Sequence, residues 1–517
     1  MSETSKALIV VVAIAALIFR LAKPIALKFS AESDFVRRRN VWFTLTVVAF
    51  LTQNFWEFCV VAVPLLVWAG RKDTNPVAFY LILLQVIPGI DVAIPTGGLG
   101  INDLFPFNMY RLLALCVLLP AAWRLRHPED PSQSRGWDAL DFLLLAYGVL
   151  QVALFVPPDL RVIYHDSFTS GLRRAFLYLV DIYLLYFVVS RTCSNRKVIA
   201  DAQASFCLSC AVMAPIAIFE TLRHWLLYST LAVRWGAVGA NFYLFRDTSL
   251  RAQASTDHPL VLGYLLAIAF GFWLYLAGHT KSVLARIGVP LLLWGGLIAA
   301  YSRGPWLGAA VIYLAFAVLS PRSLRKAANA LVVAAVTVIL VGVSPLGSRI
   351  AKVLPLMGGT LGSGSIVYRQ ELAERSWELV KQSPWFGDQN AYSKLQDLRQ
   401  GQGIIDLVNT YASVALFYGL VGLSLFLAFI TLALFRAYRA ANAPNADQDF
   451  RSLGMSLVAS ILGTLVMIAT CSFISGYVKL FYVLGGLAAS YSRLASCSTP
   501  VERYDSHAPM GKRAELP

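Results

Sequence analysis

Two arginines lie where the chain enters or leaves long apolar stretches and a third begins a long polar segment, and their chemistry favours an anionic ligand. Arg303 lies in the segment 301–308, between two apolar stretches long enough to cross a bilayer. Arg251 comes shortly before the apolar stretch that begins near Asp257. Arg369 begins a later polar segment. A guanidinium offers a planar fork of donors that matches phosphate oxygens, and it keeps its charge at physiological pH. We therefore expect Arg251 and Arg303 to be catalytic and Arg369 to bind substrate, in a site for a pyrophosphate-bearing molecule; the alternative for each is snorkelling to lipid headgroups.

Two further side chains are candidates for substrate binding. His258 is close to Arg251 in the chain and is the histidine best placed for proton transfer, with a structural role at a helix start as the alternative. Arg375 belongs to the same polar segment as Arg369. Asp181 lies inside an apolar stretch, where it is either functional or paired with an arginine. No histidine has metal-ligand spacing, so we expect neither a metal nor a cofactor.

The composition requires a membrane protein. Of the 517 residues, 57% are hydrophobic and only 14% are charged, whereas soluble proteins carry about 25% charge. The net charge of +15 is typical of basic cytoplasmic loops, and we expect no nucleic acid as a partner.

Apolar runs of bilayer length repeat along the chain and predict an all-α polytopic fold with 13 to 15 transmembrane helices. The predicted spans cover approximately 6–22, 41–69, 77–95, 107–124, 137–156, 174–190, 198–221, 258–277, 283–301, 304–319, 328–345, 409–436, 453–471 and 474–492. The segment 41–69 is long for one crossing and has Gln53, Asn54 and Glu57 at its middle. As one span it places the basic triplet 37–39 on the non-cytoplasmic side; as two short spans or a re-entrant pair it places the triplet inside, with the other basic loops.

The long polar segment 347–408 faces the non-cytoplasmic side on this map. Within it, a Gly/Ser-rich loop over 358–365 precedes an amphipathic helix over 368–382. A flexible loop followed by an interfacial helix suits a lid over a membrane-embedded cleft, and a capping loop without a catalytic role is the alternative.

Ordered motifs in the second half of the chain resemble a known family. They are Arg251 with His258-Pro259-Leu260-Val261-Leu262-Gly263; Ser302-Arg303-Gly304-Pro305-Trp306-Leu307-Gly308; Tyr368-Arg369 through Ser383-Pro384-Trp385-Phe386-Gly387; and Asn409-Thr410-Tyr411 with Phe417-Tyr418-Gly419-Leu420-Val421-Gly422-Leu423. Together they resemble the O-antigen ligase and O-antigen polymerase superfamily over roughly residues 240–435.

This resemblance implies a GT-C-like membrane glycosyltransferase that is metal-independent and inverting. Its substrate is an undecaprenyl-diphosphate-linked glycan, used on the periplasmic face of a bacterial inner membrane. The implied organisation is 1–240 N-terminal helices, 241–436 a ligase/polymerase-like core containing the periplasmic loop 347–408, 437–492 C-terminal helices and 493–517 a cytoplasmic tail. The lipid bilayer is the second implied partner, and a chain-length regulator and export machinery are further candidates.

One departure bears on the reaction. Ligases that this chain resembles carry a His-Asn pair after the large loop, and here the position reads Val408-Asn409. We therefore expect a polysaccharide polymerase for an exopolysaccharide, capsule or O-antigen, with Asn409 a substrate-binding residue. A ligase that transfers glycan to a lipid or protein acceptor is the first alternative. A transporter of small anions such as bicarbonate is the second, although the predicted arginines gather at one face instead of crossing the bilayer.

Overall fold

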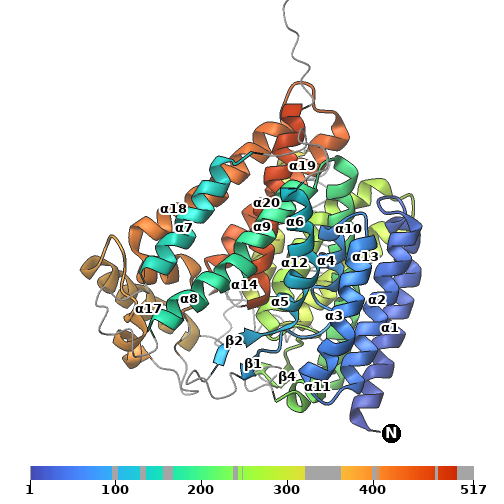
Figure 1. Cartoon of the computed structure of the whole chain (residues 1–517), viewed down its shortest axis with the longest axis horizontal. Helices are drawn as coiled ribbons and strands as arrows, with labels where there is room; N and C mark the ends of the chain where they lie inside the picture. The colour runs from blue at the N-terminus through green and yellow to red at the C-terminus, as the bar shows by residue number, and fades with distance from the viewer. Residues whose placement is uncertain are drawn as a thin grey trace, which may run out of the picture.

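The structure is a computed structural model, and it describes residues 2–95, 103–127, 136–154, 167–236, 243–246, 248–320, 363–398, 405, 407–471 and 475–497. These residues form a helical bundle with two short antiparallel hairpins, β1–β2 and β3–β4 (Figure 1). The predicted span 328–345, the loop 358–362 and most of the predicted tail 493–517 lie outside the described residues.

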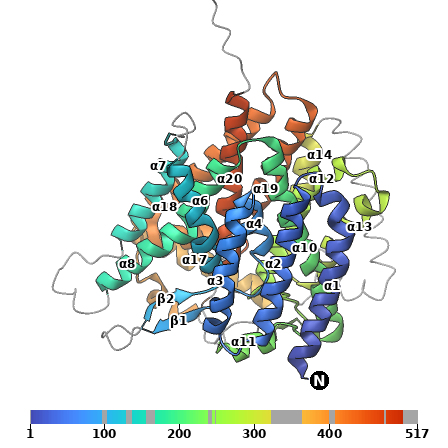
Figure 2. The same cartoon turned by 45° about the vertical axis from the view of Figure 1, so that its right-hand side comes forward.

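The first three helices form one edge of the bundle (Figures 1 and 2). They are α1 (Glu3–Ala26), α2 (Glu32–Leu51) and α3 (Phe55–Lys72). The chain breaks between α2 and α3, where Asn54 caps α3 by accepting the Glu57 N–H. Segment 41–69 is thus two helices and not one continuous span.

The basic triplet 37–39 consequently lies at the same end of the bundle as the start of α10. Arg38 is buried and pairs with Asp73 at 2.7 Å and with Asp201 on α10 at 2.8 Å. Because the pairs join α2, the end of α3 and α10, they fix the order of these helices at that end.

The next segment departs from the predicted span 77–95. Helix is limited to α4 (Pro76–Leu83), after which the chain runs to β1 (Val92–Pro95) and β2 (Asp103–Phe107). Pro88 and Gly89 follow closely on α4 and disfavour its continuation. A continuous helical stretch then follows as α5 (Met109–Leu113), a π-helical turn (Ala114–Leu118) and α6 (Leu119–Arg126).

The middle of the chain supplies α7 (Ala139–Ala153), α8 (Ser167–Tyr178), a second π-helical turn (Leu179–Tyr183), α9 (Leu184–Thr192) and α10 (Arg196–Arg223). It continues with α11 (Ser229–Arg234), β3 (Phe245–Arg246), β4 (Ser249–Leu250), α12 (Pro259–Leu276), the 3-10 turn η5 (Ala277–His279), α13 (Val283–Ala299) and α14 (Arg303–Leu319). The described part of the remainder forms α17 (Ser363–Gln382), the 3-10 segment η7 (Ala391–Leu398), α18 (Thr410–Ala441), α19 (Gln448–Ile468) and α20 (Ser475–Cys497).

The membrane character follows from helix length and composition. Five helices among the described residues are long and apolar enough to cross a membrane: 3–26, 196–223, 259–279, 410–441 and 448–468. Shorter apolar helices at 139–153, 283–299 and 303–319 add to them. The chain is therefore an all-α, multi-pass membrane protein.

The two ends of the bundle differ in chemistry. The hairpins and α11 lie at one end, which we call the hairpin end (Figure 1). At the opposite end α6, α9, α18 and α20 finish and α7, α10 and α19 begin. We call this the basic end because it carries Arg124, Arg126, Arg191, Arg196, Lys197, Arg436, Arg439 and Arg493.

Candidate functional site

Arg251 is held at the hairpin end by neutral acceptors. It follows β4, and its own N–H donates to Leu244 O at 2.9 Å, which extends the β3–β4 hairpin by one bond. Its guanidinium donates to Ser302 Oγ at 2.9 Å and to Ala300 O at 3.4 Å. Burial, with a smaller effect from nearby Arg246, lowers the pKa of Arg251 to about 10. The side chain remains charged at neutral pH.

A second arginine contacts the same corner of the chain. Arg246 on β3 donates to Tyr301 O at 2.7 Å. Tyr301 adopts a left-handed backbone conformation with φ 46°, which is unusual for a residue that is not glycine. Arg246 and Arg251 thus both bind the 300–302 corner, and this corner delivers the chain directly into Arg303.

Arg303 is the first residue of α14. The preceding Ser302 does not cap the helix with its side chain, because that hydroxyl donates to Ala300 O at 3.1 Å and accepts from Arg251. The first turn of α14 therefore directs its backbone N–H groups and the positive end of its dipole toward the same region as the arginines. A helix N-terminus flanked by guanidinium groups is suited to phosphate oxygens.

A buried carboxylate shapes the loop that carries Arg251. Glu220, near the end of α10, accepts hydrogen bonds from the N–H groups of Leu227 at 3.0 Å, Gln253 at 3.0 Å and Ala254 at 2.8 Å. Ala254 has a left-handed φ of 48°, so the loop needs this anchor to hold its path. Glu220 is fully buried and acts as a positioning residue for the arginine loop.

His258 caps α12. Its Nδ1 accepts the Leu260 N–H at 3.1 Å, which leaves the proton of the neutral ring on Nε2. Burial, and secondarily the charge of Arg251, lowers the pKa of His258 to about 4. A neutral imidazole whose basic nitrogen is already engaged favours the helix-start role over proton transfer, although Nε2–H remains a donor for a bound anion.

Close helix packing fixes Arg303 relative to its neighbours. A Cβ on Gly263 of α12 would lie 2.8 Å from Pro305 Cγ, so α12 and α14 approach as closely as a glycine permits. On its other side, α14 packs against the end of α19 through Gly304 and Thr470. The site is therefore built on the starts of α12 and α14, on rigid elements.

Asn409 lies at the same end of the bundle, and the turn at 470–471 links it to the start of α14. It caps α18, with Oδ1 accepting the N–H groups of Tyr411 at 2.9 Å and Ala412 at 3.2 Å. The next residue, Thr410, donates to Cys471 O at 2.7 Å. Because Thr470 packs on Gly304, the turn at 470–471 joins the start of α18 to the start of α14. The side-chain oxygen of Asn409 therefore has a capping role.

The structure places the other two predicted arginines on α17. Arg369 is exposed. Arg375 pairs with Glu378 and with Asp397 of η7, each at 3.0 Å, and is half exposed. These pairs tie α17 to η7 and do not bring Arg375 to the Arg251 loop, so a substrate-binding role for Arg375 gains no geometric support.

The segment containing α17 packs on α18. Leu372 and Val380 of α17 pack in a small core with Ala415 and Leu416 of α18. Backbone hydrogen bonds reinforce the contact, from Asp388 N to Leu416 O at 2.7 Å and from Leu420 N to Pro384 O at 2.7 Å. The region predicted to be a lid thus has a fixed attachment at the hairpin end of α18.

Asp181 is paired with an arginine inside the bundle, which is one of the two interpretations that the sequence left open. Its Oδ2 accepts from Arg111 at 2.8 Å, and its Oδ1 lies 3.6 Å from Lys479 Nζ. These contacts cross-link three helical segments and indicate a structural role.

Sequence reasoning missed two residues at this site. In the sequence, nothing distinguishes Arg246 from other arginines of segments predicted to face outward. The β3–β4 pairing brings it beside Arg251. Thr470 belongs to an apolar helix end with no chemical signal, and its contact with Gly304 comes from tertiary packing. Hairpin register and interhelical packing decide both positions, and neither leaves a local mark in the sequence.

A comparison with protein families gives one match. Residues 288–427 match the O-antigen ligase family. The matched segment includes Arg303, Arg369, Arg375 and Asn409, and it lies within the region that carries the resembling motifs. Arg246, Arg251 and His258 precede the matched segment, and Arg246 and Arg251 contact Tyr301 and Ser302, which come directly before Arg303. No curated protein matches the chain.

Proposed function

We propose, from the premise that residues 288–427 belong to the O-antigen ligase family, that the chain is a glycosyltransferase for lipid-diphosphate-linked glycans and that it acts as a polysaccharide polymerase. The observation that carries the proposal is that Arg246 and Arg251 both bind the 300–302 corner, directly before Arg303 at the start of α14. This site has several fixed cationic donors, and a diphosphate has several oxygens to receive them.

The proposed reaction is the one that the family resemblance implies. A hydroxyl of the acceptor glycan attacks the anomeric carbon of the donor sugar and loses its proton to water, the new C–O bond forms on the face opposite the departing oxygen, and the configuration inverts. The bond to the undecaprenyl diphosphate oxygen breaks, and the guanidinium groups offset the charge that grows there. The protein contributes positioning and electrostatics, and no metal is required.

The orientation rests on charge. The basic end carries a cluster of Arg and Lys in short connections, so we place it in the cytoplasm, and the hairpin end with its arginine site then faces the periplasm of a bacterial inner membrane. A lipid-linked donor reaches such a site from within the bilayer. A chain-length regulator and export machinery are candidate partners on the same side.

A ligase is the second candidate because the matching family model describes a ligase. The two differ only in the acceptor, which is another lipid-linked glycan for a polymerase and lipid A core for a ligase. The Val408-Asn409 pair, in place of the His-Asn pair of ligases that the chain resembles, favours the polymerase.

The test uses purified protein in lipid vesicles with undecaprenyl-diphosphate-linked repeat units from the source organism. A ladder of longer lipid-linked glycans that is lost in Arg303→Ala and kept in Arg223→Ala would support the polymerase. Arg223 is a matched control because it is exposed at the same end, in the last turn of α10. Product formed only after lipid A core is added would support the ligase, and no transfer to either acceptor by folded protein would contradict both.

A further inference from the structure

A cavity at the basic end lies between the last turn of α3 and the first turns of α6 (Figures 1 and 2). It has a volume of about 500 Å³, and its described lining residues are Arg71, Pro120, Trp123 and Arg124. The helices are close there, because a Cβ on Gly70 of α3 would lie 3.6 Å from a methyl group of Val117, just before α6. At its start α3 lies beside β2, where the centres of the Phe55 and Phe107 rings are 6.0 Å apart. The cavity is therefore at the opposite membrane face from the proposed active site.

The local sequence explains how α6 presents its side of the cavity. Pro120 follows the π-helical turn 114–118 within one continuous helical stretch. A proline ring conflicts with the preceding turn of a regular helix, and the wider π-helical turn gives it room. Beyond this point α6 turns Leu119 and Trp123 outward, and their side chains are 48% and 67% exposed. Arg124 is exposed next to them.

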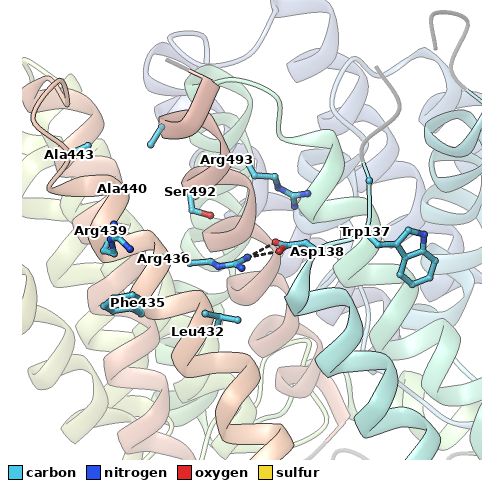
Figure 3. A pocket seen from close by; sticks show the side chains of 12 residues that line it. Trp137, Asp138, Leu432, Phe435, Arg436, Arg439, Ala440, Ala443, Ser492 and Arg493 are labelled. Atoms are coloured by element: carbon cyan, nitrogen blue, oxygen red, sulfur yellow. Dashed lines mark hydrogen bonds and ion pairs between the residues drawn. The ribbon is translucent and has the colours of Figure 1, made fainter. Parts of the chain in front are cut away.

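The two arginines of this cavity keep their donors available. The side chains of Arg71 and Arg124 make no hydrogen bond or ion pair with any other residue that the structure describes. Another cavity of the same end shows the contrast: Arg436, which lines it, donates to both carboxylate oxygens of Asp138 at 2.7 Å and 2.6 Å (Figure 3). Each guanidinium has five N–H donors in a fixed fork, so Arg71 and Arg124 are suited to an external anion.

The surface around the cavity is amphipathic along the membrane normal. Trp68, one turn before Arg71, is half exposed, and Lys72 Nζ lies 4.6 Å from the centre of its ring. Val60, about three turns before Arg71 on the same face of α3, is 75% exposed. Tryptophan between an apolar helix face and basic residues is typical of a bilayer interface. A ligand that fits both parts has an anionic head and an apolar chain.

We propose that this cavity binds an anionic glycerophospholipid, with its phosphate between Arg71 and Arg124 and an acyl chain along the outer face of α3. Guanidinium groups from two helices can share one phosphate, because each donates in a planar fork that matches the phosphate oxygens. Basic pockets between transmembrane helices at the cytoplasmic face, where we place the basic end, are suited to such headgroups. The bound lipid joins α3 to α6, and its binding does not depend on the proposed reaction.

The experiment measures lipid binding to the detergent-purified full chain by native mass spectrometry, with phosphatidylglycerol and phosphatidylcholine of identical acyl chains as probes. One double variant is Arg71→Gln with Arg124→Gln, and a second replaces both arginines by lysine, which keeps the charges. Arg286→Gln is the control because Arg286 is an exposed arginine in the first turn of α13, away from the cavity lining. Segment 128–135 lies outside the described residues, so a further variant, Glu129→Gln with Asp130→Asn, tests its two carboxylates.

We expect wild type to bind phosphatidylglycerol more tightly than phosphatidylcholine, and the glutamine variant to bind phosphatidylglycerol about tenfold more weakly while its phosphatidylcholine binding is unchanged. The lysine variant should keep the preference for phosphatidylglycerol, and the control and the Glu129–Asp130 variant should bind like wild type.

Four results would overturn the proposal. They are equal binding of the two lipids by wild type, an equal loss in Arg286→Gln, retained preference in the glutamine variant, and a large gain in the Glu129–Asp130 variant, which would show that these carboxylates already neutralise the arginines. Displacement of the lipid by millimolar inorganic phosphate would also contradict it, because it would indicate a site for free phosphate.

Discussion

Gly387 and Gly419 hold the segment after α17 against α18. At each of the two positions, a side chain would clash with the backbone of the other segment. Both have left-handed backbone conformations, with φ of 69° and 65°. A Cβ on Gly387 would lie 2.7 Å from Gly419 N, and a Cβ on Gly419 would lie 2.5 Å from Phe386 N. Two motifs that are separated in the sequence therefore meet backbone to backbone, at a kink in α18 that only glycine accommodates without strain.

Gly419→Ala should detach this segment. The substitution adds backbone strain of about 1–3 kcal/mol and a steric conflict with the backbone at 385–386. We expect a lower thermal unfolding temperature and faster proteolysis within 363–398. The control Gly278→Ala adds a methyl group where nothing lies within 4 Å, and it should behave as wild type. Unchanged proteolysis in Gly419→Ala would show that the contact is not required.

Glu220→Gln should loosen the Arg251 loop. The carboxylate accepts three backbone N–H bonds, and an amide offers one good acceptor oxygen and an NH2 group that cannot accept. Hydrogen bonds to a charged group contribute about 1.5–3 kcal/mol, so both unfolding temperature and transfer activity should fall. Glu378→Gln, at an exposed pair on α17, is the control and should change neither by much. If Glu220→Gln retained wild-type transfer, the loop would not depend on this anchor.

Ser302→Ala should weaken donor binding without removing a charge. It deletes the hydroxyl that accepts from Arg251 at 2.9 Å, and Arg251 then loses one of the contacts that orient it beside Arg303. We expect kcat/KM for the lipid-linked donor to fall about tenfold, mainly through KM, and Ser302→Thr to restore most of it. An unchanged KM in Ser302→Ala would mean that Arg251 is positioned by other contacts.

His258 should not titrate in the working pH range. Because its pKa is about 4 in the folded protein and near 6.5 when unfolded, the unfolded state takes up the proton first as pH falls. The contribution to stability is therefore present above about pH 6.5 and is lost as pH falls toward 4. His258→Asn, which can still cap α12, should keep the wild-type pH–rate profile between pH 6 and 8. Loss of an inflection near pH 7 in that variant would instead indicate proton transfer by His258.

Much of the fold could be predicted because helix ends carry local signals. Asn54, Asn75, Asn108, Asp138, Asn195 and Asp447 all cap helices with their side chains, at positions where an apolar run begins. The predicted spans over 258–319 consequently agree with α12, α13 and α14 to within a few residues. The span 77–95 was wrong because an apolar, fully buried run can form a short helix and an extended segment as well as one long helix.

The site could be predicted only in part. The sequence predicted that Arg251 and Arg303 act together because they lie at neighbouring span ends. Arg251 donates to Ser302, the residue before Arg303, and a joint role for the two arginines stays a prediction. Arg375 was indistinguishable from a binding residue in the sequence, because its partner Asp397 is distant in the chain. Charge type and span position indicate which end a residue occupies, whereas pairing between loops decides which residues meet.

The most direct measurement is the affinity of purified protein for undecaprenyl diphosphate compared with undecaprenyl monophosphate. We expect tighter binding of the diphosphate by wild type, a loss of about tenfold or more in Arg251→Ala and in Arg303→Ala, and no loss in Arg223→Ala. Wild-type affinity for the diphosphate in both arginine variants, with the proteins folded, would contradict the assignment of this site to the pyrophosphate.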